Sequence, residues 1–209
     1  MTADCSAVFQ LPAGHYRAIL ADPPWRFRTW DQREAIPRSR SSGTNVSAAT
    51  HYDTMDIEAI CALPVGELAA PDCVLFLWAT WPNLEDALRV VAAWGFVYKT
   101  AGFLWAKAHA NQLELFRDDH DGLMGLGYWT RANSEPCILA TRGRPQRLNA
   151  DVRQVIIEPR REHSRKPDCV YGRIERLVAG PYLELFARNR RAGWDAWGNE
   201  TDKFREAAE

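Results

Sequence analysis

Four consecutive residues near the N-terminus, Asp22-Pro23-Pro24-Trp25, combine groups that can hold an aromatic amine. Such an amine is a poor nucleophile because its lone pair is delocalised into the ring. The Asp22 carboxylate and the Pro23 carbonyl are two acceptors that can hold both N–H bonds and make the nitrogen more tetrahedral. The prolines fix the backbone φ angle, so this geometry is set in advance. The flat indole of Trp25 offers a base a surface on which to stack.

A purely structural interpretation of the same tetrapeptide stays open. Asp and Pro are ordinary turn formers, and Trp25 can be a core residue beside a turn that ends a strand. Under the catalytic interpretation, Asp22 need not be a strong base, because the amine nitrogen becomes acidic once it has been alkylated. Positioning and electrostatics would then provide most of the catalysis.

The elements around the tetrapeptide predict where it lies. Residues 17–21 form a short apolar run typical of a buried strand, which the two prolines end. Other strands are predicted at residues 73–78, 136–141, 152–158 and 182–187, with one or two more in 96–107. Helical spacing is found at residues 55–63, 84–94 and 168–177. Strands that alternate with helices indicate an α/β fold with a mostly parallel sheet, in which ligands bind beyond the carboxyl ends of the strands.

Finer details of these elements are also predicted. In the helix at 84–94, the apolar face is expected to consist of Leu84, Leu88, Val91 and Ala92, and Gly95 to end the helix. Pro167 is expected to begin the helix at 168–177. Residues 28–50 and 108–134 show no period and predict long loops.

The composition excludes several classes of protein. The 209 residues carry a net charge of −1, and no apolar stretch is long enough to span a bilayer. With no signal peptide at residues 1–10, we expect one domain in the cytoplasm. No global positive field marks a nucleic-acid binder, but basic clusters at residues 26–40, 160–166 and 188–191 flank the candidate segments and suggest phosphate or carboxylate contacts. Solvated surface is the plainer explanation of each cluster.

The five cysteines and five histidines show no metal-ligand spacing. Cys73 and Cys137 lie in apolar runs and are predicted to be core residues. We therefore expect neither a metal site nor a disulfide framework.

Eight segments, in order along the chain, give the sequence a specific resemblance. They are residues 19–25, 51–55, 75–80, 103–107, 135–139, 163–168, 182–188 and 193–200. From about Tyr16 to Phe204, the chain resembles the MT-A70 family of adenine-N6 methyltransferases. The resemblance implies a Rossmann-like class I S-adenosylmethionine-dependent fold with helices on both faces of the sheet. It also implies a permuted motif order, with the catalytic strand first and the cofactor strand late, and no glycine-rich cofactor loop after Phe186.

The resemblance assigns roles to individual residues. Asp22, Pro23, Pro24 and Trp25 would be catalytic. The cofactor S-adenosyl-L-methionine would be held by a set of polar side chains: Asp22, Lys166, Glu184, Arg188, Asn199 and Glu200. Lys166 and Asn199 would hold its methionine end, while Arg188 and Glu200 would bind its ribose. Glu184 would brace either the cofactor or Arg188, and the resemblance leaves open which of Arg190 and Arg191 contacts the cofactor.

The substrate side is implied in the same way. Tyr52 and Trp105 match aromatic positions near the target base, although either can equally be a core residue, as we expect of Trp78 and Trp94. The arginines of the active-site loops at 26–50 and 158–166, among them Arg26, Arg28 and Arg165, would meet the phosphate backbone. A target base in a duplex would have to be flipped out of the stack.

Several alternatives remain at this stage. The partner is expected to be nucleic acid, with DNA favoured over RNA because the short chain carries no added RNA-binding module. A non-catalytic binding subunit is a second alternative, and a methyltransferase acting on a protein or small-molecule amine is a third. The intact tetrapeptide and cofactor residues argue against the second alternative. The tryptophan at the last position of the tetrapeptide and the full match of the C-terminal part of the chain argue against the third. Monomer and homodimer are both open.

Overall fold

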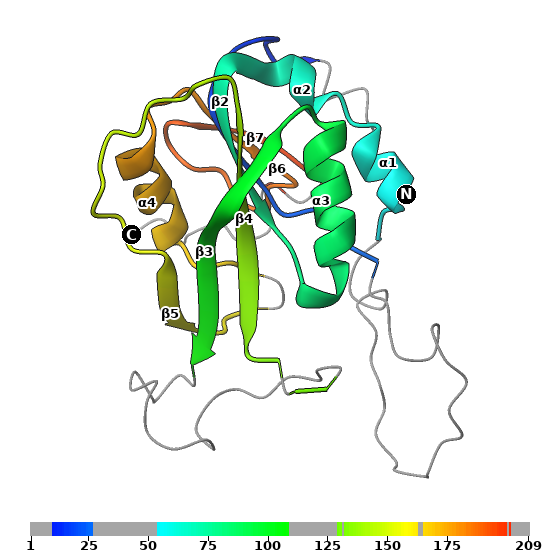
Figure 1. The fold of residues 1–209 in the computed structure, drawn as a ribbon, viewed down its shortest axis with the longest axis vertical. Helices are drawn as coiled ribbons and strands as arrows, with labels where there is room; N and C mark the ends of the chain where they lie inside the picture. Colours follow the sequence, from blue (N-terminus) through cyan, green and yellow to red (C-terminus); the bar gives the residue numbers. More distant parts are fainter. Residues whose placement is uncertain are drawn as a thin grey trace.

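A computed structural model describes residues 10–26, 54–108, 129–130, 132–162, 165–199 and 201. Its centre is one seven-stranded sheet with the order β5-β3-β4-β2-β1-β6-β7 (Figure 1). The strands are β1 (Tyr16–Ala21), β2 (Ala69–Trp78), β3 (Val97–Ala108), β4 (Ser134–Arg142), β5 (Val155–Pro159), β6 (Tyr182–Leu185) and β7 (Trp194–Trp197). The predicted loops at 28–50 and 108–134 fall almost wholly outside the described residues.

The sheet is mostly parallel, as the sequence predicts. β1 pairs in parallel with β2 on one side and β6 on the other, and the pairs β3–β5 and β6–β7 are also parallel. β4 alone among the described strands runs the other way, antiparallel to both β2 and β3. The carboxyl ends of the remaining strands, together with the beginning of β4, therefore share one edge of the sheet.

Helices cover both faces of this sheet, which confirms the expected α/β arrangement. They are α1 (Ile57–Cys61), α2 (Val65–Leu68), the 3₁₀ turn η4 (Trp81–Asn83), α3 (Leu84–Ala93) and α4 (Cys169–Leu177). Along β1, Ile19 and Ala21 pack with α1, α2 and α3, whereas Ala18 and Leu20 pack on the face that α4 covers. α3 and α4 lie on opposite sides of the sheet in Figure 1. A central strand that is buried on both faces explains the apolar run at residues 18–21 of β1.

The buried face of α3 differs from the prediction. Ala87, Val90 and Val91 are buried, whereas Leu88 and Ala92 are exposed. The packing of α3 against α1 and the sheet, rather than the largest apolar side chains, selects the inner face. The predicted C-terminal signal is confirmed, because Gly95 adopts a φ of +79° directly after the helix.

Of the one or two strands predicted in 96–107, the structure has one, the long strand β3. Two differences concern the end of the sheet. The strand predicted at 182–187 ends at Leu185, because Phe186 adopts a φ of +62° and turns the chain out of the sheet. β7 is not predicted, since its four residues are too few to show alternation.

The neighbouring positions of β1 and β6 bring distant parts of the chain together. Asp22 follows β1, and its backbone N–H donates to the carbonyl of Leu185 at the end of β6 (3.4 Å). Beyond β7, Gly198 passes so close to the turn at Phe186 that a Cβ atom there would lie 2.5 Å from the Ala187 carbonyl oxygen. The sheet thus gathers the early tetrapeptide and the late Glu184–Arg188 segment at one edge. Within the described residues, no helix is long and apolar enough to cross a membrane.

Candidate active site

A pocket opens at this carboxyl edge, between the ends of β1, β2 and β6 and the beginning of α4. It contains apolar residues, three carboxylates and three cationic side chains. Its lining consists of Leu20, Asp22, Trp78, Arg165, Lys166, Pro167, Asp168, Val170, Tyr171, Glu184, Phe186, Arg188 and Asn189. Four residues expected at the cofactor (Asp22, Lys166, Glu184 and Arg188) and one expected at the substrate (Arg165) therefore line one pocket.

The backbone of the tetrapeptide is fixed by hydrogen bonds. The Trp25 N–H donates to the Pro23 carbonyl (2.8 Å), and the Met55 N–H donates to the Pro24 carbonyl (3.0 Å). A carbonyl oxygen has two lone pairs, so the Pro23 oxygen can accept a second hydrogen bond. The turn therefore holds the Pro23 carbonyl in a defined direction beside Asp22.

Trp25 anchors this turn in the core rather than offering its face to a base. The side chain is 6% exposed, and its indole N–H donates to the Trp78 carbonyl (3.0 Å). A buried indole with a satisfied N–H stabilises the turn from behind. The stacking role expected from the sequence is not supported by this position, whereas the core interpretation of Trp25 fits it.

Lys166 binds the Asp22 carboxylate directly. Its Nζ donates to Asp22 Oδ2 (2.8 Å), lies 3.4 Å from Glu135 Oε2, and sits over the Trp78 ring at 5.7 Å from its centroid. Burial by itself would lower the pKa of Lys166, but the charges of Asp22 and Glu135 outweigh it and raise the pKa. Lys166 is thus a charged group inside the site that orients Asp22.

Glu135 is a part of the site that the sequence reasoning missed. It lies at the beginning of β4 and pairs with Lys107 as well as with Lys166. Burial alone would raise the pKa of Glu135, but the two lysines more than offset this and hold the pKa below its usual value. The only signal in the sequence is its place in the segment 135–139, to which the resemblance assigns no role.

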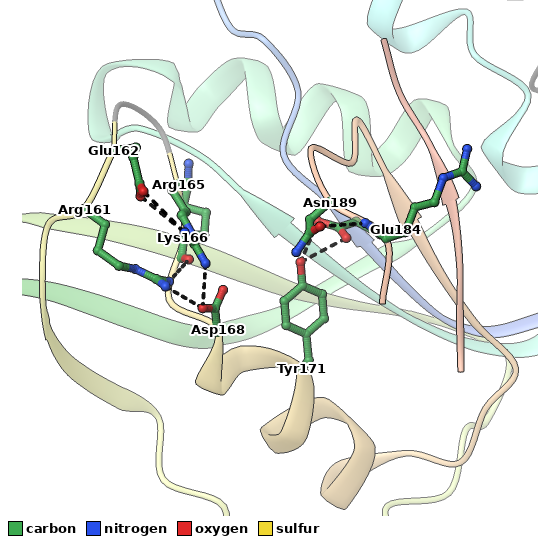
Figure 2. Close-up of polar contacts among 9 residues, drawn as sticks. Arg161, Glu162, Arg165, Lys166, Asp168, Tyr171, Glu184 and Asn189 are labelled. Carbon is green, nitrogen blue, oxygen red and sulfur yellow. Dashed lines mark hydrogen bonds and ion pairs between the residues drawn. The ribbon is translucent and has the colours of Figure 1, made fainter. Parts of the chain in front are cut away.

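Glu184 has a different kind of partner. The hydroxyl of Tyr171, on α4, lies 3.0 Å from both carboxylate oxygens of Glu184 (Figure 2). Burial raises the pKa of Glu184 to about 7, assisted by the charges of Asp22 and Asp168, although the Tyr171 hydrogen bond opposes the rise. The Arg191 guanidinium lies over the Tyr171 ring at 4.9 Å and pairs with Glu175. Glu184 is therefore braced by Tyr171, and the Tyr171 ring in turn packs against Arg191.

A cluster of charges forms the wall at the beginning of α4. Arg165 pairs with Asp168 (3.2 Å) and Glu162 (3.4 Å), and Arg161 pairs with Asp168 and donates to the Lys166 carbonyl (2.9 Å) (Figure 2). Burial opposes the ionisation of Asp168, but the two arginines prevail and lower its pKa. Arg165 thus contributes charge at the pocket while being held in place by two acids.

The other predicted residues lie in varied places. Trp105 is 2% exposed and its indole N–H donates to the Glu158 carbonyl (2.9 Å), so it is a core residue and its predicted contact with the base is not supported. Asn199 is exposed beyond β7, apart from the residues that line the pocket. Arg26 is exposed and pairs with Asp56. Tyr52, Arg28 and Glu200 lie outside the described residues. Trp78 and Trp94 are buried, as predicted.

Comparison with known proteins identifies a family and several relatives of this chain. A family model described as MT-A70 matches residues 16–200. The chain is 32% identical over 200 residues to the type II methyltransferase M.MunI of Mycoplasma. This alignment covers 91% of this chain and 80% of that relative. It is 31% identical to an N(6)-adenosine-methyltransferase MT-A70-like protein of Arabidopsis thaliana over 92% of this chain. It is 30% identical to the human N(6)-adenosine-methyltransferase catalytic subunit METTL3 over 90% of this chain. The chain spans only 24% and 29% of the length of these two eukaryotic relatives.

Proposed function

The chain belongs to the MT-A70 family of methyltransferases, and from this premise we propose that it methylates the exocyclic N6 amine of adenine in DNA, using S-adenosylmethionine. The observation that carries the proposal is the meeting of Asp22, Lys166 and Glu184 in one pocket, although Asp22 and Lys166 are 144 residues apart in sequence. The names of the eukaryotic relatives specify N(6)-adenosine as the methylated group, which supports the choice of the amine.

The pocket suits the chemical groups of S-adenosylmethionine. Carboxylates such as Glu184 can accept from an ammonium or from ribose hydroxyls, and Arg188 can pair with a carboxylate. Leu20, Val170 and Phe186 offer apolar surface for the nucleoside part. When bound, this cofactor supplies a methyl group on a positively charged sulfur.

The residues of this chain position the amine. The Asp22 carboxylate and the Pro23 carbonyl each accept a hydrogen bond from one N–H of the amine. This arrangement directs the nitrogen lone pair away from the two acceptors. Lys166 holds Asp22 by its Oδ2 atom (2.8 Å), so Oδ1 is the oxygen that faces the amine. After the nitrogen has formed its fourth bond, it is a cation that still carries two hydrogens, and one of these leaves to water as a proton because such an arylammonium ion is strongly acidic.

DNA is the proposed substrate in preference to RNA. The alignment covers most of the type II methyltransferase of Mycoplasma but less than a third of the adenosine methyltransferases of Arabidopsis and human. The similarity to the larger proteins is thus confined to one part of them, and RNA remains the second candidate substrate.

The test is methyl transfer from radiolabelled S-adenosylmethionine to duplex DNA, single-stranded DNA and single-stranded RNA, with nucleoside analysis of the product. We expect N6-methyladenine in DNA. Asp22→Asn keeps the shape of the side chain but replaces an ionic acceptor by an amide, so the rate should fall by about 10²–10³-fold. Cofactor binding, measured by calorimetry, should persist in this variant.

Asp151→Asn is the matched control, because Asp151 is an exposed carboxylate on the surface and pairs with Arg176. It should methylate at the wild-type rate. Full activity of Asp22→Asn would refute the proposed role of Asp22, and methylation of RNA alone would refute the choice of DNA.

A further inference from the structure

Trp81 is exposed in a chain that buries most of its other described tryptophans. Its side chain is 48% exposed, whereas Trp78, Trp94 and Trp105 are at most 2% exposed, and Trp25, Trp194 and Trp197 at most 7%. An exposed indole gains nothing from burial in the core, and tryptophan is enriched at surfaces that bind other molecules. The position of Trp81 therefore calls for an explanation other than packing.

The ring of Trp81 is held in one orientation. Its indole N–H donates to the Ser134 hydroxyl (3.1 Å), and Pro82 follows it in the 3₁₀ turn η4. Proline fixes the backbone at this point, and the hydrogen bond fixes the edge of the ring. Trp81 thus presents a preorganised aromatic surface, which lowers the entropy cost of binding.

Trp81 lies at the same edge of the sheet as the active site. It comes three residues after the end of β2, and its partner Ser134 begins β4. Ser134 directly precedes Glu135, which pairs with Lys166, and Lys166 in turn binds Asp22. A continuous series of contacts therefore joins the exposed indole to the catalytic carboxylate.

Arg26, a positively charged residue, is linked to the turn that carries Trp81. Asn83 is 3% exposed, accepts from the Thr80 hydroxyl (3.0 Å) and donates to the Arg26 carbonyl (3.2 Å). This buried amide links the turn that carries Trp81 to the residue that follows the tetrapeptide. The Arg26 side chain is 70% exposed, and although it pairs with Asp56 (2.9 Å), its guanidinium has further donors.

We propose that Trp81 stacks against a nucleotide that flanks the target adenine, while Arg26 contacts its phosphate. This inference rests on the proposed function and adds a second binding element to it. Extraction of one base from a duplex leaves its neighbour without a stacking partner, and an aromatic side chain can take that place. Stacking tolerates any base, so Trp81 contributes affinity and position rather than sequence selection.

The experiment compares wild type with Trp81→Ala, Trp81→Phe and Tyr98→Ala. Tyr98 is the matched control, because it is 50% exposed but lies near the beginning of β3, at the opposite edge of the sheet. Affinity for fluorescent DNA oligonucleotides is measured by anisotropy, and KM and kcat are measured with the same DNA. We expect Trp81→Ala to raise both the DNA Kd and KM about tenfold, and Trp81→Phe to recover most of the loss. Tyr98→Ala and the cofactor Kd should be unchanged.

Oligonucleotides that carry an abasic site beside the target adenine provide the decisive arm. On the strand position that Trp81 contacts, wild type and Trp81→Ala should bind them equally, because no flanking base remains to stack. A tenfold defect that persists on abasic DNA on either side, or an unchanged Kd on normal DNA, would overturn the inference, and the exposed indole would then be a contact for a protein partner. Wild-type DNA methylation in the same assay tests the proposed function separately.

Discussion

Glu135 and Glu184 are the same type of residue at the same edge of the sheet, yet their environments shift the pKa in opposite directions. Burial raises the pKa of both. Two lysines reverse this effect at Glu135, whereas Glu184 has the neutral Tyr171 hydroxyl, which only reduces the rise to about 7. The comparison shows that the charge of the neighbouring group, rather than the depth of burial, decides which carboxylate is ionised at neutral pH.

The difference divides the pocket into two parts. Around Lys166, the positive and negative charges of Asp22, Glu135 and Lys107 alternate, so the arrangement is set in the protein alone. Around Glu184, the hydrogen-bond donor is the neutral Tyr171 hydroxyl, and the charge of Arg191 only partly opposes the raised pKa, so a positively charged ligand would favour the ionised form. Under the proposed function, the first part would position the substrate amine, and the ionisation of the second would depend on the ligand that binds there.

Removal of the shared cation should have the largest effect. Lys166→Met keeps the length of the side chain but leaves Asp22 and Glu135 without their lysine. We expect methyl transfer to fall at least about 10²-fold and the free energy of unfolding to fall by about 2 kcal/mol. Urea denaturation and single-turnover kinetics measure the two effects, and Lys99→Met, at an exposed position of β3, is the control.

The Lys166→Met variant also tests the direction of the pKa shift of Glu135. The folded pKa of Glu135 is below its unfolded value, so its stabilising contribution is present above the unfolded pKa and is lost as the pH falls through the folded pKa. In Lys166→Met this loss of stability in acid should become smaller. An unaltered pH dependence of unfolding would show that Lys166 does not set the ionisation of Glu135.

The pH dependence of cofactor binding should be a smaller effect. Because the pKa of Glu184 is raised to about 7, its carboxylate forms only as the pH rises through that value. The Kd of S-adenosylhomocysteine, the thioether product that has no methyl group left to transfer, should therefore decrease roughly tenfold from pH 6 to pH 8, at one protonation per site. Calorimetry measures this change.

Glu184→Gln is the control for that change, because its amide does not ionise. Its Kd should be flat across the same pH range. The stability of the protein should show the opposite trend: a raised carboxyl pKa favours the protonated folded state, so the contribution of Glu184 falls as the pH rises from the unfolded value towards 7. A Kd that stays constant in wild type would remove Glu184 from the cofactor site.

Removal of a solvent-exposed ion pair should have the smallest effect on the free energy of unfolding, which makes it a reference for the buried pairs of Lys166. Arg176 and Asp151 are 2.6 Å apart, but their side chains are 56% and 70% exposed. Arg176→Ala should lower the free energy of unfolding by less than about 1 kcal/mol, and the difference should shrink in high salt. A loss as large as that of Lys166→Met would mean that solvent exclusion does not explain the strength of the Lys166 pairs.

Local sequence patterns predicted much of the scaffold. The apolar run before Asp22, the two prolines that end it, and Gly95 after α3 each act over a few residues, and the structure agrees with all three. The helix after Pro167 is likewise found, as α4. Where packing decides, the prediction was less accurate: the inner face of α3 and the end of β6 both depend on neighbouring elements that the local pattern does not encode.

The sequence by itself determined the type of fold and, through the resemblance, the family and five of the thirteen residues that line the pocket. Only the tertiary structure decided which of these residues touch. Lys166 binds Asp22 and Glu135, a residue with no predicted role, while Trp25 and Trp105 are core residues. The physical reason is that hydrophobic periodicity is read within one element, whereas the pairing of β1 with β6, and of β4 with β2, is a choice of strand order between segments far apart in the chain.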